Sequence, residues 1–186
     1  MQEAVRTILM YGVIPVWILA GLGDWWSHRR TQIERNAGLA ESAMHSLMMA
    51  QVGIPVLLAL FFEINALLLA AMVAGIAVHA VTAWIDVRYA SRFREIVPFE
   101  QHMHSLLEVL PITAFLLVAS VHWDQLLALF GGAGEPDYRL RLKEEPLPAS
   151  YLAGLMATLL VFVVAPYAEE LLRCARARPA WRRQKA

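Results

Sequence analysis

The sequence predicts an all-α integral membrane protein with about five transmembrane helices, four of them forming an antiparallel bundle with a polar metal site at one end. Two observations support this fold class. The 186-residue chain is 59% hydrophobic and only 17% charged, and its mean hydropathy is +0.50, which is unlike a soluble domain. Several apolar runs also approach the roughly 20 residues that cross a bilayer as a helix. The length suits a single domain.

Each span follows from one apolar run, and the predicted spans cover residues 7–26, 39–62, 65–86, 99–123 and 150–171. The first run resembles a cleaved signal peptide, but polar residues like those on the other spans follow it, so we expect a retained helix. The short FFEIN turn predicts a hairpin of the second and third spans. Pro15, Pro55 and Pro111 are expected to kink their helices. Ala71 and Gly75 suit close helix packing.

The loops predict the orientation. One side of the membrane holds twelve Lys and Arg residues and the other holds four: Arg29, Arg30, Arg35, Arg88, Arg92, Arg94, Arg173, Arg176, Arg178, Arg182, Arg183 and Lys185 against Arg6, Arg139, Arg141 and Lys143. The positive-inside rule therefore predicts an extracytoplasmic N-terminus and a cytoplasmic C-terminus. Residues 124–149 are interpreted as an extracytoplasmic loop and residues 172–186 as a basic cytoplasmic tail.

The overall charge and the cysteine count limit the functional classes. The formal net charge is zero, so the overall charge balance carries no information about nucleic acid, and no nucleic-acid partner is expected. Cys174 is the single cysteine, which rules out a disulfide within the chain and argues against a cysteine-ligated metal cluster.

Ionisable residues gather at the predicted cytoplasmic end of four spans. Each span pairs a carboxylate with a histidine at helical spacing, which places both on one helix face. The predicted metal ligands are Asp24 and His28, Glu41 and His45, His79 and Asp86, and Glu100, His104 and Glu108. Four helices with inward carboxylates and histidines are typical of dimetal carboxylate bundles. Mixed imidazole and carboxylate ligands favour iron, with zinc or manganese as alternatives.

Some of these polar residues also suit simpler roles. Asp24 and Asp86 lie where apolar runs end. Taken alone, each could be a charged residue at the membrane interface and not a metal ligand. A hydrogen-bonded polar cluster without metal is the alternative for the whole set. His102 is a further candidate ligand, although it points about 200° away from His104 on a regular helix. Arg94 is interpreted as a positive-inside residue, and Glu169 and Glu170 as interface charges.

The leading functional hypothesis is a membrane-embedded di-iron enzyme that oxidises a lipid or another hydrophobic substrate with dioxygen. Its expected partners are membrane lipids, the hydrophobic substrate and an electron donor. A second hypothesis is a zinc-dependent hydrolase of a lipid amide or ester, with Glu108 as the general base. A metal transporter or sensor is a third, and a cytochrome b with haem between two histidines is a fourth. The H-x-x-H-H box of membrane desaturases is absent, so the likeness to those enzymes is one of chemistry alone.

Overall fold

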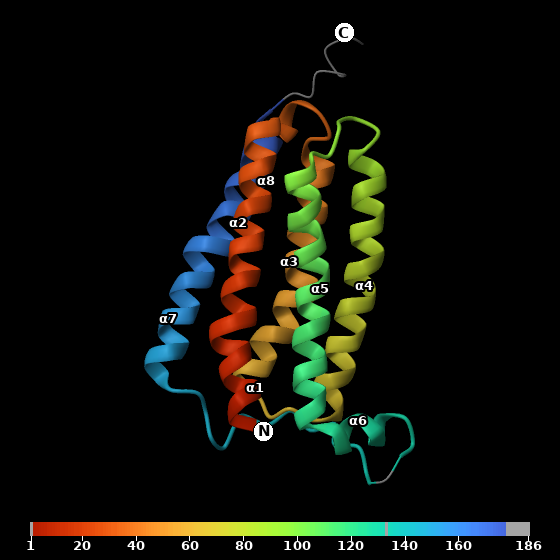
Figure 1. Ribbon diagram of the computed structural model, residues 1–186, viewed down its shortest axis with the longest axis vertical. Coiled ribbons are helices and arrows are strands. Elements are labelled where there is room, and N and C mark those ends of the chain that lie inside the picture. The colour runs from red at the N-terminus through yellow and green to blue at the C-terminus, as the bar shows by residue number, and fades with distance from the viewer. Residues whose placement is uncertain (1, 133, 178–186) are drawn as a thin grey trace.

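The computed structural model describes residues 2–132 and 134–177, and these residues fold into a bundle of helices without a named strand (Figure 1). Five helices are long and apolar enough to cross a membrane, which fits the predicted integral membrane protein with about five spans. Their bounds are Gln2–Thr31, Leu39–Phe61, Ala66–Ala90, Pro98–Val121 and Ala149–Arg176. Four of the predicted basic-tail residues (Arg178, Arg182, Arg183 and Lys185) lie outside the described residues.

The first and last spans are each continuous but contain a π-helical turn. The first consists of α1 (Gln2–Ile8), the π turn η1 (Leu9–Val13) and α2 (Ile14–Thr31). The last consists of α7 (Ala149–Leu159), the π turn η3 (Leu160–Val164) and α8 (Ala165–Arg176). Each π turn ends two residues before a proline, Pro15 or Pro166. A proline lacks the amide donor of a regular helix, and the wider turn accommodates that loss.

The remaining spans are regular helices with identifiable ends. They are α3 (Leu39–Phe61), α4 (Ala66–Ala90) and α5 (Pro98–Val121). The Asn65 side chain caps α4 by accepting a hydrogen bond from the Leu68 amide at 3.2 Å. Pro98 begins α5, where its missing N–H costs nothing. The predicted loop 124–149 contains most of a short helix, α6 (Trp123–Leu129).

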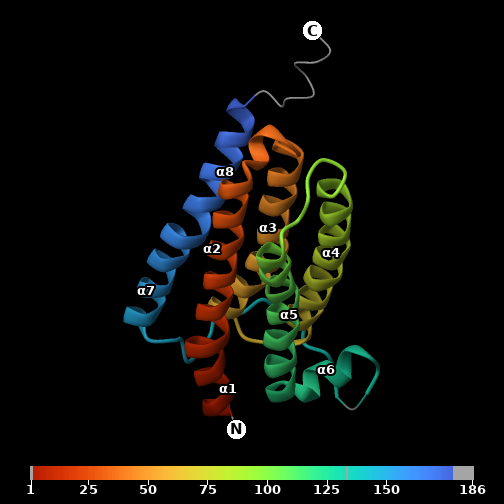
Figure 2. The ribbon, with the colours of Figure 1, turned by 45° about the horizontal axis from the view of Figure 1, so that its top comes forward.

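The helices pack side by side, with α3 against α4 and α8, and α5 against α2 and α4. Figures 1 and 2 show α7 and α8 running obliquely beside α2, while α6 lies at the end of the bundle where α1 begins, next to α4 and the end of α5. The end of α8 lies at the opposite end of the bundle (Figure 1). At Gly75 the backbone of α4 approaches α3 so closely that a Cβ atom would lie 2.6 Å from the Gln51 carbonyl oxygen. The small residue predicted for packing therefore sets the distance between these helices.

Candidate metal centre

A group of buried ionisable side chains lies at the α8 end of the bundle, where the ends of α2, α4 and α8 meet the starts of α3 and α5. We define the polar cluster as Asp24, His28, Glu41, His45, Asp86, Arg94, Glu100, His104 and Glu170. Every carboxylate in it has a relative exposure of 3% or less. The cluster thus joins residues of all five spans and of the loop before α5.

Helical spacing on α2 places two of the predicted ligands together, and a third comes from α5. Asp24 and His28 lie one turn apart, with 3.5 Å between Asp24 Oδ1 and His28 Nε2. The same Asp24 oxygen lies 3.0 Å from His104 Nε2. His28 Nε2 is also 3.3 Å from Glu100 Oε1. Imidazole and carboxylate atoms of two helices therefore surround one small region.

Glu170 on α8 connects two of the histidines from the opposite side. Its two oxygens lie 3.0 Å from His28 Nδ1 and 3.0 Å from His45 Nδ1. The two imidazole rings are stacked, with centroids 4.5 Å apart and planes at 7°. If both Nδ1 atoms donate to Glu170, each Nε2 carries a lone pair toward carboxylates on other helices. Such a carboxylate–histidine pair is the usual way in which proteins orient a metal-binding imidazole.

The interpretation of Glu170 as an interface charge is therefore wrong: the side chain is 2% exposed and lies inside the cluster. Its neighbour Glu169 does lie at the surface, where it pairs with Arg29 at 2.6 Å and accepts a hydrogen bond from Trp25. The sequence feature that could have indicated this role is the pair of adjacent glutamates, Glu169 and Glu170, near the end of the fifth apolar span. Only the docking of α8 on α3 distinguishes the inward residue from the outward one.

Arg94, in the loop before α5, also belongs to the cluster. Its guanidinium forms ion pairs with Glu41 and Glu100, and its side chain is 4% exposed. Burial alone would lower the pKa of Arg94, but hydrogen bonds and charge from the two glutamates raise it above its usual range. Arg94 thus holds together two of the predicted ligands, Glu41 and Glu100. From the sequence alone, this arginine is interpreted only as a residue that sets the membrane orientation.

Side chains of the cluster form three overlapping groups that have the spacing of metal ligands. In the first, Asp24, His28, Glu100 and His104 each offer one ligand atom, and these atoms lie within 4.8 Å of one another. Glu41, His45 and Asp86 form a second such group, and the third, His28, His45 and His104, takes its histidines from both. Within the described part of the chain, Asp24 Oδ1 and His28 Nε2 make only the ion-pair contacts given above, and the buried Asp86 Oδ1 has no polar partner at all. Buried polar atoms are rarely left in this state without a ligand, an ion or water.

The charges of the cluster do not cancel. Five buried carboxylates face one guanidinium, so neutral histidines leave four uncompensated negative charges. Charge of this size at a membrane helix bundle is costly unless cations are bound or protons are taken up.

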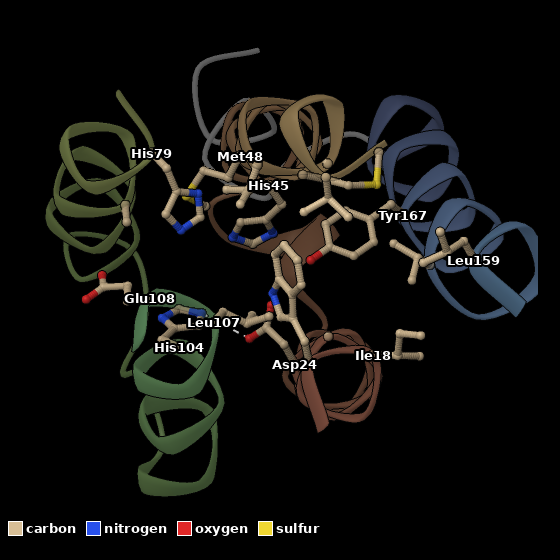
Figure 3. A pocket seen from close by; sticks show the side chains of 18 of the residues that line it. Ile18, Asp24, His45, Met48, His79, His104, Leu107, Glu108, Leu159 and Tyr167 are labelled. Carbon is tan, nitrogen blue, oxygen red and sulfur yellow. Dashed lines mark ion pairs between the residues drawn. The ribbon is translucent and has the colours of Figure 1, made fainter. Parts of the chain in front are cut away.

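Three predicted site residues lie outside these groups. His79 is 9% exposed, and neither of its ring nitrogens has a hydrogen-bond partner among the residues the structure covers. Glu108 is exposed and points away from Asp24 in Figure 3. His102 is exposed on α5. The seven-residue spacing of His79 and Asp86 places them on one face, but it also separates them by about 10 Å along the helix axis.

An apolar cavity of about 140 Å³ opens directly beside the cluster. Asp24, His45 and His104 line one end of it, and Ile18, Leu107 and Leu159 are among its apolar walls (Figure 3). The wall also includes His79, Glu108 and Tyr167. The ligand atoms are therefore accessible from a space that suits hydrocarbon.

No protein-family model, no curated protein and no solved structure matches this chain. Any functional assignment therefore rests on the chemistry of the polar cluster and of its cavity.

Proposed function

We propose that this chain is a membrane-embedded dimetal enzyme that oxidises a lipid or another hydrophobic substrate with dioxygen, with iron as the preferred metal. The observation that carries the proposal is the excess charge of the polar cluster. Two divalent cations would neutralise its four uncompensated negative charges, whereas protonation of His28, His45 and His104 would still leave one. The four-helix antiparallel bundle with a metal site is part of this proposal.

The first two ligand groups would hold the two metal ions. In one group Asp24, His28 and His104 are the ligands, and in the other His45 and Asp86. Glu41 and Glu100 belong to the same groups, but Arg94 occupies part of their oxygens. Glu170 would orient two histidines through Nδ1 and leave Nε2 free for the metal. Imidazole and carboxylate ligands suit iron, zinc and manganese.

The cavity favours oxidation of an apolar group over hydrolysis. Its walls are mostly hydrocarbon, which would exclude bulk water and hold a substrate chain beside the ligand atoms. Bound iron would supply the dioxygen chemistry, with two electrons from the substrate and two from a donor protein. A zinc hydrolase would need a general base near the metal, and the candidate Glu108 points away from Asp24 (Figure 3).

A haem site and a transport site fit the cluster less well. The candidate axial ligands of a haem are His45, His79 and His104, but carboxylates lie against two of these imidazoles: Asp86 and Glu170 at 3.1 and 3.0 Å from His45, and Asp24 at 3.0 Å from His104. A transport site is expected near the bilayer midplane, whereas this cluster lies at one end of the spans. By the positive-inside rule we place that end on the cytoplasmic side, where an electron donor would reach it.

The test is an oxidation assay on protein loaded anaerobically with ferrous iron in lipid nanodiscs. We expect an absorption change when dioxygen is admitted, and an oxidised lipid or fatty acid detected by mass spectrometry. His104→Ala should abolish both signals, while His122→Ala, at the opposite end of the bundle, should retain them. Bound iron that does not respond to dioxygen would contradict the oxidase assignment, and stoichiometric zinc with ester or amide cleavage would replace it.

A further inference from the structure

The small cavity beside the polar cluster, of about 140 Å³, has one buried polar side chain that the cluster does not use. Four of its lining residues belong to the cluster: Asp24, His45, Asp86 and His104. His79 lies in the same wall but in none of the groups with the spacing of metal ligands. It points from α4 toward the interior of the bundle (Figure 3). This imidazole is therefore placed to bind a molecule that enters the cavity.

The His79 imidazole is buried without a hydrogen bond. Its side chain is 9% exposed, and both ring nitrogens lack a partner in the described part of the chain. The Met48 backbone lies close to the ring, but a hydrogen bond to its carbonyl would use one nitrogen at most. Glu108 lines the cavity too, but it is exposed and forms no ion pair with His79. Unpartnered buried nitrogens cost stability, and a ligand that supplies a partner removes this cost.

The chemistry of the imidazole and of the walls selects the polar group of such a ligand. A neutral imidazole offers one donor and one acceptor, and a hydroxyl group can both accept and donate. A charged ligand would lose its hydration against walls that are mostly hydrocarbon, which is costly. The group that fits His79 is therefore an uncharged hydroxyl.

The size and the walls of the cavity select the body of the ligand. The volume of about 140 Å³ is similar to the roughly 150 Å³ of a cavity that binds benzene. Three aromatic side chains line it: Trp17, Phe162 and Tyr167. Aromatic rings attract one another edge to face or with an offset stack. A single aromatic ring with a hydroxyl group, which is a phenol, therefore fits both the apolar volume and His79.

The position of His79 would place such a ring next to the candidate metal ligands. His79 precedes Asp86 by seven residues on α4, which is about 10 Å along the helix axis. The cavity extends from His79 to Asp24, His45 and His104 (Figure 3). A hydroxyl group bound at His79 thus leaves the ring between this residue and the polar cluster.

We propose that the small cavity binds an uncharged phenol from the membrane, with the hydroxyl group hydrogen-bonded to His79 and the ring beside Asp24 and His104. This assignment rests on the proposed function and names its substrate class. His79 is then a positioning residue, which determines the ligand and the edge of the ring that faces the metal.

Fluorine NMR measures this binding without turnover. Protein in phosphatidylcholine nanodiscs is titrated with para-fluorophenol, both metal-free and loaded with zinc, which has no redox chemistry. The comparison compound is para-fluorotoluene, in which a methyl group replaces the hydroxyl, and empty nanodiscs give the uptake of each compound by the bilayer. We expect saturable binding of the phenol, at least about fivefold tighter than that of the toluene after this correction, because the toluene leaves the imidazole unpartnered.

Substitution of His79 tests the hydrogen bond. His79→Leu should abolish the preference for the phenol over the toluene, while His79→Gln, whose amide offers a donor and an acceptor, should retain part of it. Without ligand, the unfolding midpoint of His79→Leu should equal or exceed that of the wild type, since two unpartnered buried atoms are removed. His122→Leu is the matched control, because His122 is a half-buried histidine in the wall of a separate cavity at the opposite end of the bundle.

A pair of alanines on α4 tests the location of the ring. Ala83 is buried one turn after His79 and lines the small cavity, whereas Ala80 is exposed on the same helix. Ala83→Leu would fill part of the cavity and should weaken binding of both compounds severalfold. Ala80→Leu should leave both affinities unchanged.

The outcomes separate this proposal from the proposed function. A preference for the phenol that persists in His79→Leu, or that is lost equally in His122→Leu, would overturn the phenol site. Displacement of para-fluorophenol by cyclohexanol as effectively as by phenol would also overturn it, because cyclohexanol presents its hydroxyl on a nonaromatic ring. Binding that depends on His79 in a protein that takes up no metal would keep the phenol site and remove the enzyme. Stoichiometric metal binding without saturable binding of the phenol would overturn the phenol site alone.

Discussion

Replacing Glu170 by glutamine tests whether this carboxylate orients two histidines for metal binding. The carboxylate lies 3.0 Å from both His28 Nδ1 and His45 Nδ1, so it can accept from both rings. A glutamine accepts one such hydrogen bond and donates the other. The ring that faces its NH₂ group must then place its proton on Nε2, which removes one lone pair from the cluster.

The size of the effect follows from that loss. Changes to a residue that orients a metal-binding histidine typically cost about 10–100-fold in metal affinity, or about 1.4–2.7 kcal/mol. The metal-free protein should respond differently, because the substitution removes one of five buried negative charges. We therefore expect the unfolding midpoint of metal-free Glu170→Gln to equal or exceed that of the wild type, while its stabilisation by metal is smaller.

The assay is competition with a coloured chelator, supported by thermal unfolding with and without metal. Glu169→Gln is the matched control, since Glu169 is the adjacent residue on α8 and pairs with Arg29 at the surface. Equal metal affinity in Glu170→Gln and the wild type would refute the orienting role. An equal loss of metal affinity in Glu169→Gln would show that metal binding depends on the packing of α8 against the bundle and not on the Glu170 carboxylate.

Three further substitutions, two of them with a matched control variant, test separate parts of the account. Arg94→Met leaves two buried glutamates without their cation, so the metal-free protein should lose about 3–5 kcal/mol of unfolding free energy, measured by denaturant titration; an unchanged midpoint would contradict the ion pairs. His104→Ala should lower metal content by dialysis and elemental analysis, whereas His102→Ala should match the wild type, and an equal loss of metal in both variants would mean that His104 is not the histidine of α5 that faces the cluster. Gly75→Ala should destabilise the α3–α4 contact by about 1–3 kcal/mol, because its Cβ would overlap the Gln51 carbonyl. Gly53→Ala, where a Cβ meets open space, should be neutral or slightly stabilising in the same thermal scan.

Hydropathy predicted the five spans because lipid-facing helices must be apolar along most of their length. The predicted hairpin of residues 39–62 and 65–86 differs from α3 and α4 by only a few residues at each end. The first helix extends beyond its predicted span at both ends, to Gln2 and Thr31. Amphipathic ends contain charged residues that a hydropathy window excludes, although they remain helical.

Residue spacing predicted which helix faces carry the cluster, as for Asp24 with His28. It did not predict partners from distant segments. Arg94 and Glu170 come from a loop and from the fifth span, and only tertiary packing brings them against Glu41, Glu100 and the histidines. Spacing shows which residues share a helix face but not how far each lies from the cluster. It therefore groups His79 with Asp86, although His79 lies about two turns before Asp86 on α4 and farther from the cluster.

The central claim is that the polar cluster binds two divalent metal ions, and its most direct test is the metal content of the folded protein. The protein is loaded anaerobically with ferrous iron and then freed of excess metal. Elemental mass spectrometry gives its metal content, and circular dichroism gives its helicity. We predict about two iron ions per chain in the wild type, and less than one in a His45→Ala, His104→Ala double variant of unchanged helicity. A helical wild-type protein that retains no iron, zinc or manganese would contradict the account.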